Sequence, residues 1–334
     1  MIVTRTPLRV SFLGGGSDYE SFYKSNTGYV LGTTINQYVY VSLLALPEFA
    51  EEKYRFTYRI TESVQKISDF VHPVVKSSLI AKNWSKPINL ATMSDLPGRS
   101  GLGSSSSFTV GLELALAEFG NEKIEPRELA MRAVQIERRE LAEAGGLQDQ
   151  YQAAVGGFKL YEFKSSQIGY SDSLNGEFLS NSMVLVPMND WRDSHNFAES
   201  TNNVIQTKEG NKIVSDLANL ASNTFNELET TSSSEQKLRI LSTAMNYGWE
   251  KKVELSGGTI SPQVMEVVDA GKAKGALAGR LCGAGGSGFV LFLTDPDMRD
   301  SLVESFHAQR AFPIEPSESG SELLLTGDSE ISND

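Results

Sequence analysis

Apolar and polar positions alternate near the start of the chain. Leu8, Val10 and Phe12 take every second position, with Arg9 and a serine between them, which is the pattern of a strand with one buried face. Arg9 is therefore expected to face away from the apolar trio. Three glycines at 14–16 end this strand, and a second apolar run covers residues 38–46. The beginning of the chain predicts β structure.

Farther along, the apolar spacing changes to the three- and four-residue period of helices. One helix is predicted to begin after Ser104 and reach Phe119, and a second to begin near Pro126 and end before Gly145. Two more helices and two short strands are predicted at 211–228, 234–255, 289–293 and 322–326.

Length and polarity divide the chain into two parts. Domains usually contain about 100–200 residues, so 334 residues favour two of them. The polar stretch between residues 169 and 182 predicts the junction, which gives an N-terminal domain over 1–175 and a C-terminal domain over 176–334.

Net charge and cysteine count limit which partners the protein is expected to bind and in which cellular compartment we expect it. The formal net charge of −12 argues against binding to nucleic acid or to an anionic membrane, although a local basic pocket remains compatible with it. The single cysteine, Cys282, forms no intrachain disulfide, which fits a reducing compartment. The first residues lack the pattern of a signal peptide, and polar residues break the uncharged run at 25–47. We expect a cytoplasmic protein.

Three glycine clusters are candidates for anion binding, because glycine lets backbone N–H groups approach a phosphate closely. The cluster at 97–107 reads Pro-Gly-Arg-Ser-Gly-Leu-Gly-Ser-Ser-Ser-Ser and leads directly into an apolar helix, as a triphosphate site requires. A turn with a serine N-cap, the alternative, needs only one serine. The cluster is not a Walker A loop, because no Gly-Lys-Ser or Gly-Lys-Thr follows it.

Other motif-based classes are disfavoured. The cluster at 283–288 formally matches Gly-x-Gly-x-x-Gly, but a strand-like segment follows it where a dinucleotide-binding fold has a helix. No Gly-x-Ser-x-Gly marks a hydrolase nucleophile. The three histidines are widely spaced, which disfavours a histidine zinc site.

Three carboxylates are candidates for chemistry. Glu137 lies on an apolar helical stripe, where its charge needs a cation, either an arginine or a metal; the alternative is an edge glutamate paired with a surface cation. Asp149 follows two glycines and is equally interpretable as a helix N-cap. Asp18, beside the first glycine cluster, is equally interpretable as a turn residue.

Together these segments resemble the GHMP family of small-molecule kinases, which includes galactokinase, homoserine kinase, mevalonate kinase and phosphomevalonate kinase. The first motif is TPLRVSFLGGGSDY at 6–19, the second lies at 97–107, and the third lies at 281–289. Glu137 and the run at 146–150 resemble the segment with the metal-ligand glutamate and the catalytic aspartate. The resemblance implies an α+β fold, with a ribosomal-protein-like N-terminal domain, a ferredoxin-like C-terminal domain, and substrate and ATP bound between them.

The resemblance also implies roles for individual residues. Asp149 is expected to be the general base, with Arg9 beside it and near the transferring phosphoryl group, and Ser105 with Glu137 is expected to hold Mg²⁺. The residues implied in ATP binding are Pro97, Gly101, Gly103, Ser104, Ser105, Ser106 and Ser107. Those implied in substrate binding are Asp18, Gly15, Gly16, Gly285 and Arg99. A phosphate on the substrate needs cationic contacts, for which Lys24, Arg99, Arg192 and Lys252 are candidates.

Within the family, the wording of the first motif and of residues 146–150 is most similar to bacterial D-glycero-D-manno-heptose 7-phosphate kinases. This implies transfer of the ATP γ-phosphoryl group to the C1 hydroxyl of that sugar phosphate, for nucleotide-heptose synthesis. The partner implied is this small-molecule sugar phosphate, with a homodimer as assembly and neither nucleic acid nor membrane. The alternatives are a sugar 1-kinase for an unphosphorylated hexose such as fucose, a non-catalytic sugar and ATP sensor, and an ATP-dependent decarboxylase that shares the fold.

Overall fold

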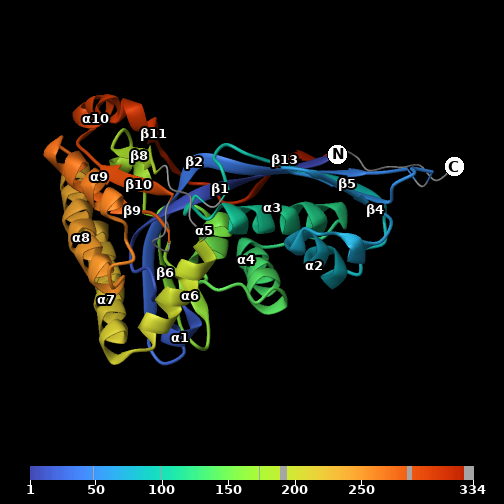
Figure 1. Cartoon of the computed structure of the whole chain (residues 1–334), viewed down its shortest axis with the longest axis horizontal. Helices are drawn as coiled ribbons and strands as arrows, with labels where there is room; N and C mark the ends of the chain where they lie inside the picture. The colour runs from blue at the N-terminus through green and yellow to red at the C-terminus, as the bar shows by residue number, and fades with distance from the viewer. Residues whose placement is uncertain (48, 99, 173, 189–193, 284–287, 327–334) are drawn as a thin grey trace.

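The computed structural model of the protein describes residues 1–47, 49–98, 100–172, 174–188, 194–283 and 288–326. Within these residues, the strands form a nine-stranded sheet and a four-stranded sheet, and helices pack against both (Figure 1). Figure 1 shows α2, α3 and α4 on one side of the nine-stranded sheet, which we call the large sheet.

The strands follow one another in this order: β1 (Ile2–Leu13), β2 (Gly28–Ala45), β3 (Tyr54–Thr57), β4 (Thr61–Val64), β5 (Ile88–Ser94), β6 (Lys159–Phe163), β7 (Ile168–Tyr170), β8 (Met183–Pro187), β9 (Ala278–Leu281), β10 (Phe289–Leu293), β11 (Phe312–Ile314), β12 (Pro316–Ser317) and β13 (Glu322–Thr326). The helices are α1 (Glu20–Tyr23), α2 (Pro73–Ala81), α3 (Ser104–Phe119), α4 (Pro126–Val134), α5 (Gln148–Val155), α6 (Ser194–Ile205), α7 (Lys208–Thr230), α8 (Ser234–Leu255), α9 (Pro262–Ala273) and α10 (Arg299–Ser305). A π-helical segment over Gln135–Glu140 continues α4.

The large sheet is built on its two long strands, β1 and β2. Its main path is β13-β1-β2-β5-β3-β4; β6 and β12 pair with β2, and β7 pairs with β6. As the alternation predicted, Leu8, Val10 and Phe12 are fully buried. Arg9 points the other way, toward α5 and the start of α3.

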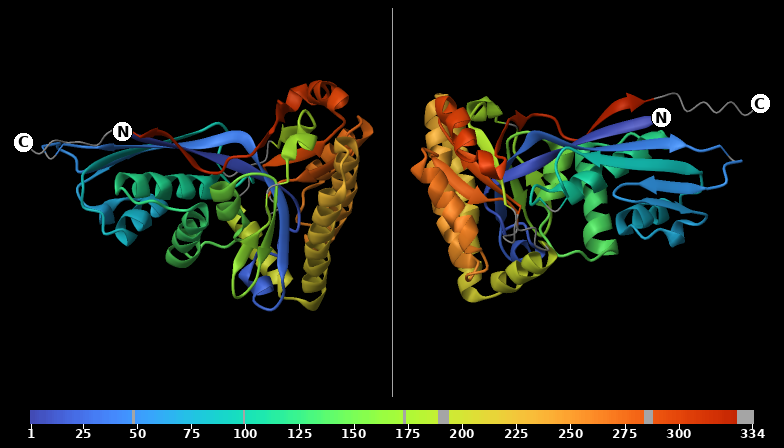
Figure 2. Two further views of the ribbon diagram at one scale, coloured as in Figure 1. Left: turned by 180° about the vertical axis from the view of Figure 1, so that it is seen from behind. Right: turned by 45° about the horizontal axis from the view of Figure 1, so that its top comes forward.

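The small sheet has the order β11-β8-β10-β9, with antiparallel neighbours throughout. Helices α7 and α8 stand across one end of the large sheet in all views (Figures 1 and 2). Their first turns are fixed by side-chain caps, since Thr207 accepts a hydrogen bond from Gly210 N and Ser233 accepts one from Gln236 N.

The last described residues return to the large sheet. β12 pairs with β2, and β13 pairs antiparallel with β1, so the strand expected at 322–326 is present and joins the sheet formed by the start of the chain. The small sheet is formed by residues 183–314. The domain division at residue 175 stays a prediction.

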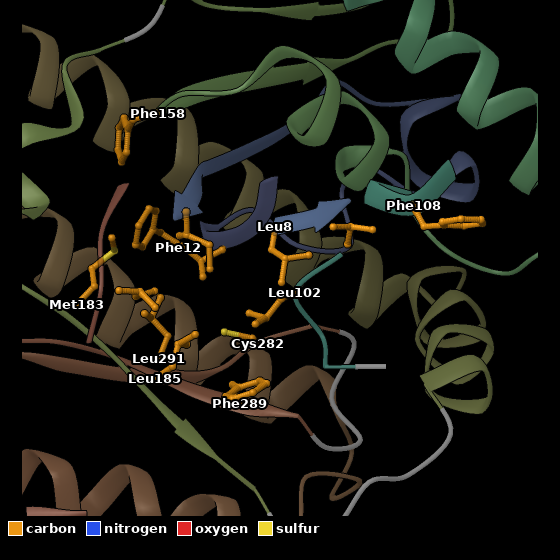
Figure 3. Close-up of a cluster of buried hydrophobic side chains, with 14 of the residues drawn as sticks. Leu8, Phe12, Leu102, Phe108, Phe158, Met183, Leu185, Cys282, Phe289 and Leu291 are labelled. Carbon is orange, nitrogen blue, oxygen red and sulfur yellow. The ribbon is translucent and has the colours of Figure 1, made fainter. Parts of the chain in front are cut away.

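A continuous apolar core joins the two sheets. Leu8 and Phe12 of β1 pack in one cluster with Met183 and Leu185 of β8 and Leu291 of β10, and all five are fully buried (Figure 3). Burying side chains of this size stabilises a fold by about 1.5–3 kcal/mol each. Because interiors are close-packed, this core holds the two halves, and the groups between them, in a fixed arrangement.

One strand differs from the sequence prediction. β2 begins at Gly28, well before the apolar run at 38–46, because its first half is stabilised by polar pairing: Thr34 Oγ1 donates to Ser317 O at 2.6 Å and accepts from Gly157 N at 2.8 Å. Buried polar residues that are hydrogen-bonded leave no apolar alternation in the sequence. The helix from Pro126 ends at Glu140 through its π-helical segment, before Gly145 as predicted.

Candidate active site

A cavity of about 710 Å³ lies where the two halves meet. Its walls come from β1, the start of α3, the segment from Glu137 to α5, the end of α8, and the backbone after β9. Elements distant in sequence therefore contribute side chains to one cavity, and their positions depend on the shared core.

Arg9 and Asp149 form an ion pair in the cavity wall. Arg9 Nε donates to Asp149 Oδ1 at 2.8 Å and Nη2 donates to Oδ2 at 2.7 Å, while Nη1 donates to Gly101 O at 2.6 Å. Bidentate pairing of this kind fixes both position and orientation. Asp149 lies in the first turn of α5, whose N-cap position is Leu147, so the alternative of a helix N-cap is wrong. Its carboxylate is partly exposed and faces the cavity.

The start of α3 lies in the same wall and has the backbone geometry that anion sites use. Gly103 takes the N-cap position with a φ of 78°, and a Cβ there would lie 3.2 Å from Arg9 Cγ and 3.5 Å from Asp149 Oδ2. The first-turn N–H groups of a helix lack intrahelical partners and carry the positive end of the dipole. Gly101, Gly103, Ser104, Ser105 and Ser106 all line the cavity, which suits nucleotide phosphates.

Two residues of the expected phosphate loop point elsewhere. Ser107 is fully buried and its hydroxyl donates to Pro7 O at 2.8 Å, so it fastens α3 to β1. Pro97 is exposed before the loop and is not among the residues that line the cavity.

Glu137 is buried at the junction of α3, α5 and the π-helical segment. Its carboxylate accepts from Thr109 Oγ1 at 2.6 Å, from Ser106 Oγ at 2.8 Å and from Gln150 Nε2, and Arg138 Nη2 lies 3.7 Å away. With only 1% of its surface exposed, Glu137 is not an edge glutamate. Burial raises the pKa of this carboxyl group, and Arg138 and the hydroxyl donors oppose that rise.

The hydroxyl that contacts Glu137 is that of Ser106. Ser105, which the resemblance implies as a Mg²⁺ ligand together with Glu137, is exposed at the helix start, and its role as a ligand stays a prediction. In the described part of the chain, no three His, Cys, Asp or Glu side chains gather as a metal cluster. A buried carboxylate beside serine hydroxyls still fits Mg²⁺, because this ion takes few protein ligands and completes its shell with phosphate oxygens and water.

Asp18 is fully buried where the first glycine turn meets the segment before α5. Its Oδ1 accepts from Gly16 N at 3.2 Å, and its Oδ2 accepts from both Gln148 N and Gln148 Nε2 at 3.1 Å. It is therefore more than a turn residue, since it joins two segments distant in sequence. Burial raises the pKa of Asp18. Asp18, Gly15 and Gly16 line the cavity, as expected of substrate-binding residues.

Gly146 leaves no room for a side chain beside Asp18. An ideal Cβ there would lie 1.8 Å from Asp18 Oδ2, and Arg138 Nε donates to Gly146 O at 3.2 Å, which holds this backbone in place. We expect Gly146→Ala to displace Asp18, to lower the free energy of unfolding by about 1–3 kcal/mol and to weaken substrate binding. Thermal unfolding and substrate KM measure this. Gly169→Ala in β7, whose Cβ would meet its nearest atom at 3.8 Å, is the control; equal effects of both substitutions would contradict the explanation.

The family comparison agrees with this geometry. The model described as "GHMP kinases N terminal domain" matches residues 69–157, and "GHMP kinases C terminal" matches residues 231–310. The first range contains the start of α3, Glu137 and Asp149, and together the two cover about half of the chain. The chain belongs to the GHMP kinase family. It is an ATP-dependent sugar kinase with the GHMP kinase fold that the sequence motifs implied.

Relatives of this GHMP kinase include sugar kinases. It is 28% identical over 329 residues, 93% of this chain and 94% of the relative, to a D-glycero-alpha-D-manno-heptose 7-phosphate kinase of Campylobacter jejuni. A galactokinase of Thermotoga maritima is 27% identical over 156 residues, which are 46% of this chain and 43% of that protein.

Solved structures share the whole fold. A D-glycero-D-manno-heptose 1-phosphate kinase from Bacteroides thetaiotaomicron superposes with a TM-score of 0.77 at 22% identity, covering 98% of this chain and all of that one. The mevalonate kinase of Methanococcus jannaschii gives a TM-score of 0.72 at 17% identity, over 94% of this GHMP kinase and 98% of that chain. No helix within the described residues combines the length and apolar character needed to cross a membrane.

Some site residues were predicted and others were not. Arg99 and Gly285, expected to bind substrate, and Arg192 lie outside the described residues. Sequence reasoning missed Thr109 beside Glu137, and the polar link from Asp18 through Gln148 to Ser11, whose hydroxyl donates to Gln148 Oε1. Gln148 stands next to Asp149 within the motif, a signal that could have found it. Arg280, two residues before Cys282, lines the cavity and was also missed.

Proposed function

We propose that this GHMP kinase transfers the γ-phosphoryl group of ATP to the anomeric C1 hydroxyl of D-glycero-D-manno-heptose 7-phosphate, giving the 1,7-bisphosphate. The observation that carries the proposal is the Arg9–Asp149 pair, which faces the cavity beside the start of α3. Similarity along nearly the whole chain to a heptose 7-phosphate kinase supports this choice of sugar.

Asp149 acts as the general base in this proposal. The C1 oxygen bonds to the γ-phosphorus, the bond from that phosphorus to the β,γ-bridging oxygen breaks, ADP leaves, and the hydroxyl proton passes to Asp149. An anomeric hydroxyl is more acidic than an ordinary alcohol, so a carboxylate is a competent acceptor. Arg9 holds both carboxylate oxygens and adds positive charge where the phosphoryl group passes.

The phosphates of ATP are proposed to lie at the start of α3. Gly101 and Gly103 let the backbone approach them, and the first-turn N–H groups with Ser104 and Ser105 donate to their oxygens. Mg²⁺ is proposed to bind Glu137 together with the hydroxyl of Ser105 or of Ser106, the residue already in contact with it. When bound, this ion neutralises charge on the phosphates.

Two other functions are compatible with the same site. A sugar 1-kinase for an unphosphorylated hexose such as fucose would use the same base and phosphate loop; a fucokinase/guanylyltransferase of Bacteroides fragilis is 25% identical over 250 residues, 70% of this chain but 25% of that protein. A sugar and ATP sensor is disfavoured by the complete Arg9–Asp149 pair, because binding alone does not need a base.

Release of ADP from Mg-ATP across a panel of acceptors tests the proposal. The panel contains D-glycero-D-manno-heptose 7-phosphate, mannose, fucose, galactose and mevalonate. We expect turnover with the heptose phosphate and at most a few per cent of that rate with the others. Turnover confined to a free hexose would contradict the substrate and retain the chemistry. Binding of sugar and ATP without ADP release would favour the sensor.

Glu137→Gln tests the metal assignment. The substitution keeps the shape but removes the charge that faces the cation, so we expect the Mg²⁺ concentration for half-maximal rate to rise about 10-fold or more, with a lower kcat. Glu140→Gln, in the same π-helical segment but exposed, is the matched control. An unchanged Mg²⁺ dependence in Glu137→Gln would remove Glu137 from the metal site.

A further inference from the structure

Arg280 is a buried cation with an unused donor. It lies in β9 with 6% of its surface exposed, lines the cavity, and donates from Nη1 to Phe12 O. Its Nε has no hydrogen-bond partner within the described residues. Buried polar atoms are rarely left unpaired, so this guanidinium has capacity for a ligand.

Lys252 lies beside Arg280 in the same wall. Its Nζ donates to the backbone oxygens of Gly283 and Leu281 near the end of α8. Its ionic neighbours are Arg280, Arg9 and the Cys282 thiol; burial and the two arginines lower the pKa of Lys252 well below its usual value. Burial likewise lowers the pKa of Arg280, to about 10. Neither side chain forms an ion pair with a carboxylate in the described part of the chain.

The other cavity cations differ from this pair. Arg9 is held by Asp149, and Arg138 lies 3.7 Å from carboxylate oxygens of both Glu137 and Glu143. Holding two cations together in a buried wall without a counter-charge costs folding free energy. A dianion such as a phosphate monoester would restore the balance, because its oxygens accept several charge-assisted hydrogen bonds.

The pair adjoins both the first glycine turn and the phosphate loop, since Lys252 donates to Gly283 O and a Cβ at Gly283 would lie 2.7 Å from Gly101 Cα. Arg280 donates to Phe12 O, two residues before the glycine turn that holds Asp18, and a Cβ at Gly15 in that turn would meet no atom within 4 Å. Open space therefore lies beside Gly15, which lines the cavity. Ser256, one helical turn after Lys252, also lines it. The start of α3, by contrast, has its own donors for the nucleotide phosphates.

We propose that Lys252 and Arg280 form the subsite for a phosphate monoester already present on the sugar acceptor. This inference rests on the proposed function and selects one of the cations that the sequence offered. Lys24, another of them, is exposed and paired with Glu20. The same pair of cations could instead receive the terminal phosphate of ATP, and the experiment separates these two sources.

The test measures binding by titration calorimetry in the wild type, Lys252→Met, Arg280→Gln and the control Lys251→Met. Lys251 neighbours Lys252 on α8 but pairs with Glu254. The probes are D-glycero-D-manno-heptose 7-phosphate, the same heptose without phosphate, and the ATP analogue AMP-PNP with Mg²⁺. We expect the two subsite variants to lose about 10- to 100-fold in affinity for the phosphorylated heptose only, the usual effect of removing a charged hydrogen bond. The control should match the wild type.

Three results would overturn the subsite: equal losses for both heptoses, a loss confined to AMP-PNP, or a wild type that binds both heptoses equally well. The failure of the proposed function is distinct. Binding lost only with the phosphorylated heptose, in a protein that releases no ADP, would refute the transfer and keep the subsite. If ADP were released from Mg-ATP in the presence of heptose 7-phosphate, and the variants had unchanged affinities and KM, the transfer would be kept and the subsite refuted.

Stability without ligand separates a binding role from a structural one. Because Lys252 has a lower pKa in the folded than in the unfolded chain, the unfolded chain binds more protons from that lowered pKa up to about 10.5, and stability rises with pH over that range. Lys252→Met removes this cost, so we expect the ligand-free variant to unfold at a temperature at least as high as that of the wild type at pH 7. Because the wild type gains stability as the pH rises toward 10.5, any advantage of the variant in unfolding temperature should shrink over that range. If Arg280→Gln does not fold, Lys252→Met alone still decides whether the pair binds the phosphate or stabilises the fold. A large loss of stability in Lys252→Met would mark the pair as structural and overturn the proposal.

Discussion

Asp149→Asn is expected to lower kcat by about 10³-fold and to leave KM for ATP and for the sugar within about threefold. The amide keeps the size of the side chain but cannot take the hydroxyl proton, and general-base catalysis contributes about 10²- to 10⁴-fold. It also replaces one acceptor oxygen of the bidentate pair with Arg9 by a donor, which loosens the guanidinium. Steady-state kinetics with Mg-ATP and saturating sugar phosphate measure both parameters.

The control for this substitution is Asp95→Asn. Asp95 is exposed and its carboxylate accepts from Tyr38 N at 2.8 Å, away from the cavity residues. The control should keep its kcat within about twofold of the wild type. An Asp149→Asn enzyme with wild-type turnover would refute the assignment of the base, and a rise in KM with unchanged kcat would make Asp149 a binding residue.

Arg9→Met is expected to lower kcat by about 10²-fold or more. The substitution removes the cation near the transferring phosphoryl group and both hydrogen bonds that orient Asp149, and single preorganised donors of this kind contribute about 10²- to 10³-fold. It also frees Gly101 O in the phosphate loop, so KM for ATP should rise. Arg9→Lys, which keeps the charge without the planar fork, should recover part of kcat.

Arg5→Met is the matched control because Arg5 lies on the same strand but pairs with Glu322, outside the cavity. Its kinetic constants should equal those of the wild type. If Arg9→Met were unfolded at the assay temperature, and Arg9→Lys restored the unfolding temperature without restoring kcat, Arg9 would be structural. Its role near the phosphoryl group would then be refuted.

The sequence predicted local elements best where their ends carry specific chemistry. The helix at 234–255 has its predicted bounds, and the helix predicted to begin after Ser104 begins at that residue, because serine or glycine caps and apolar periodicity agree at both positions. The pairing of the strand at 322–326 with β1 was not predictable, since contacts between the two ends of a chain leave no local pattern. The early start of β2 was missed because hydrogen-bonded Thr34 replaces apolar alternation there.

The candidate site shows the same division. Arg9 and Asp149 were expected together because both motifs are specific, and the structure brings them into bidentate contact. The contact between Ser106 and Glu137 was not predicted, because a run of four serines does not say which hydroxyl faces inward along a helix. No sequence motif that we recognised marks Arg280 as a site residue. Only the packing of β9 against β1 reveals it as a buried cation in the cavity wall.

Phosphorus NMR of the reaction product tests the central claim most directly. After incubation of the enzyme with Mg-ATP and D-glycero-D-manno-heptose 7-phosphate, we expect ADP and a sugar with two phosphate signals. The new signal should be a doublet, because an anomeric phosphate couples to the single proton on C1. A new phosphate that couples to any other position, or ADP formed without a doubly phosphorylated sugar, would contradict the account.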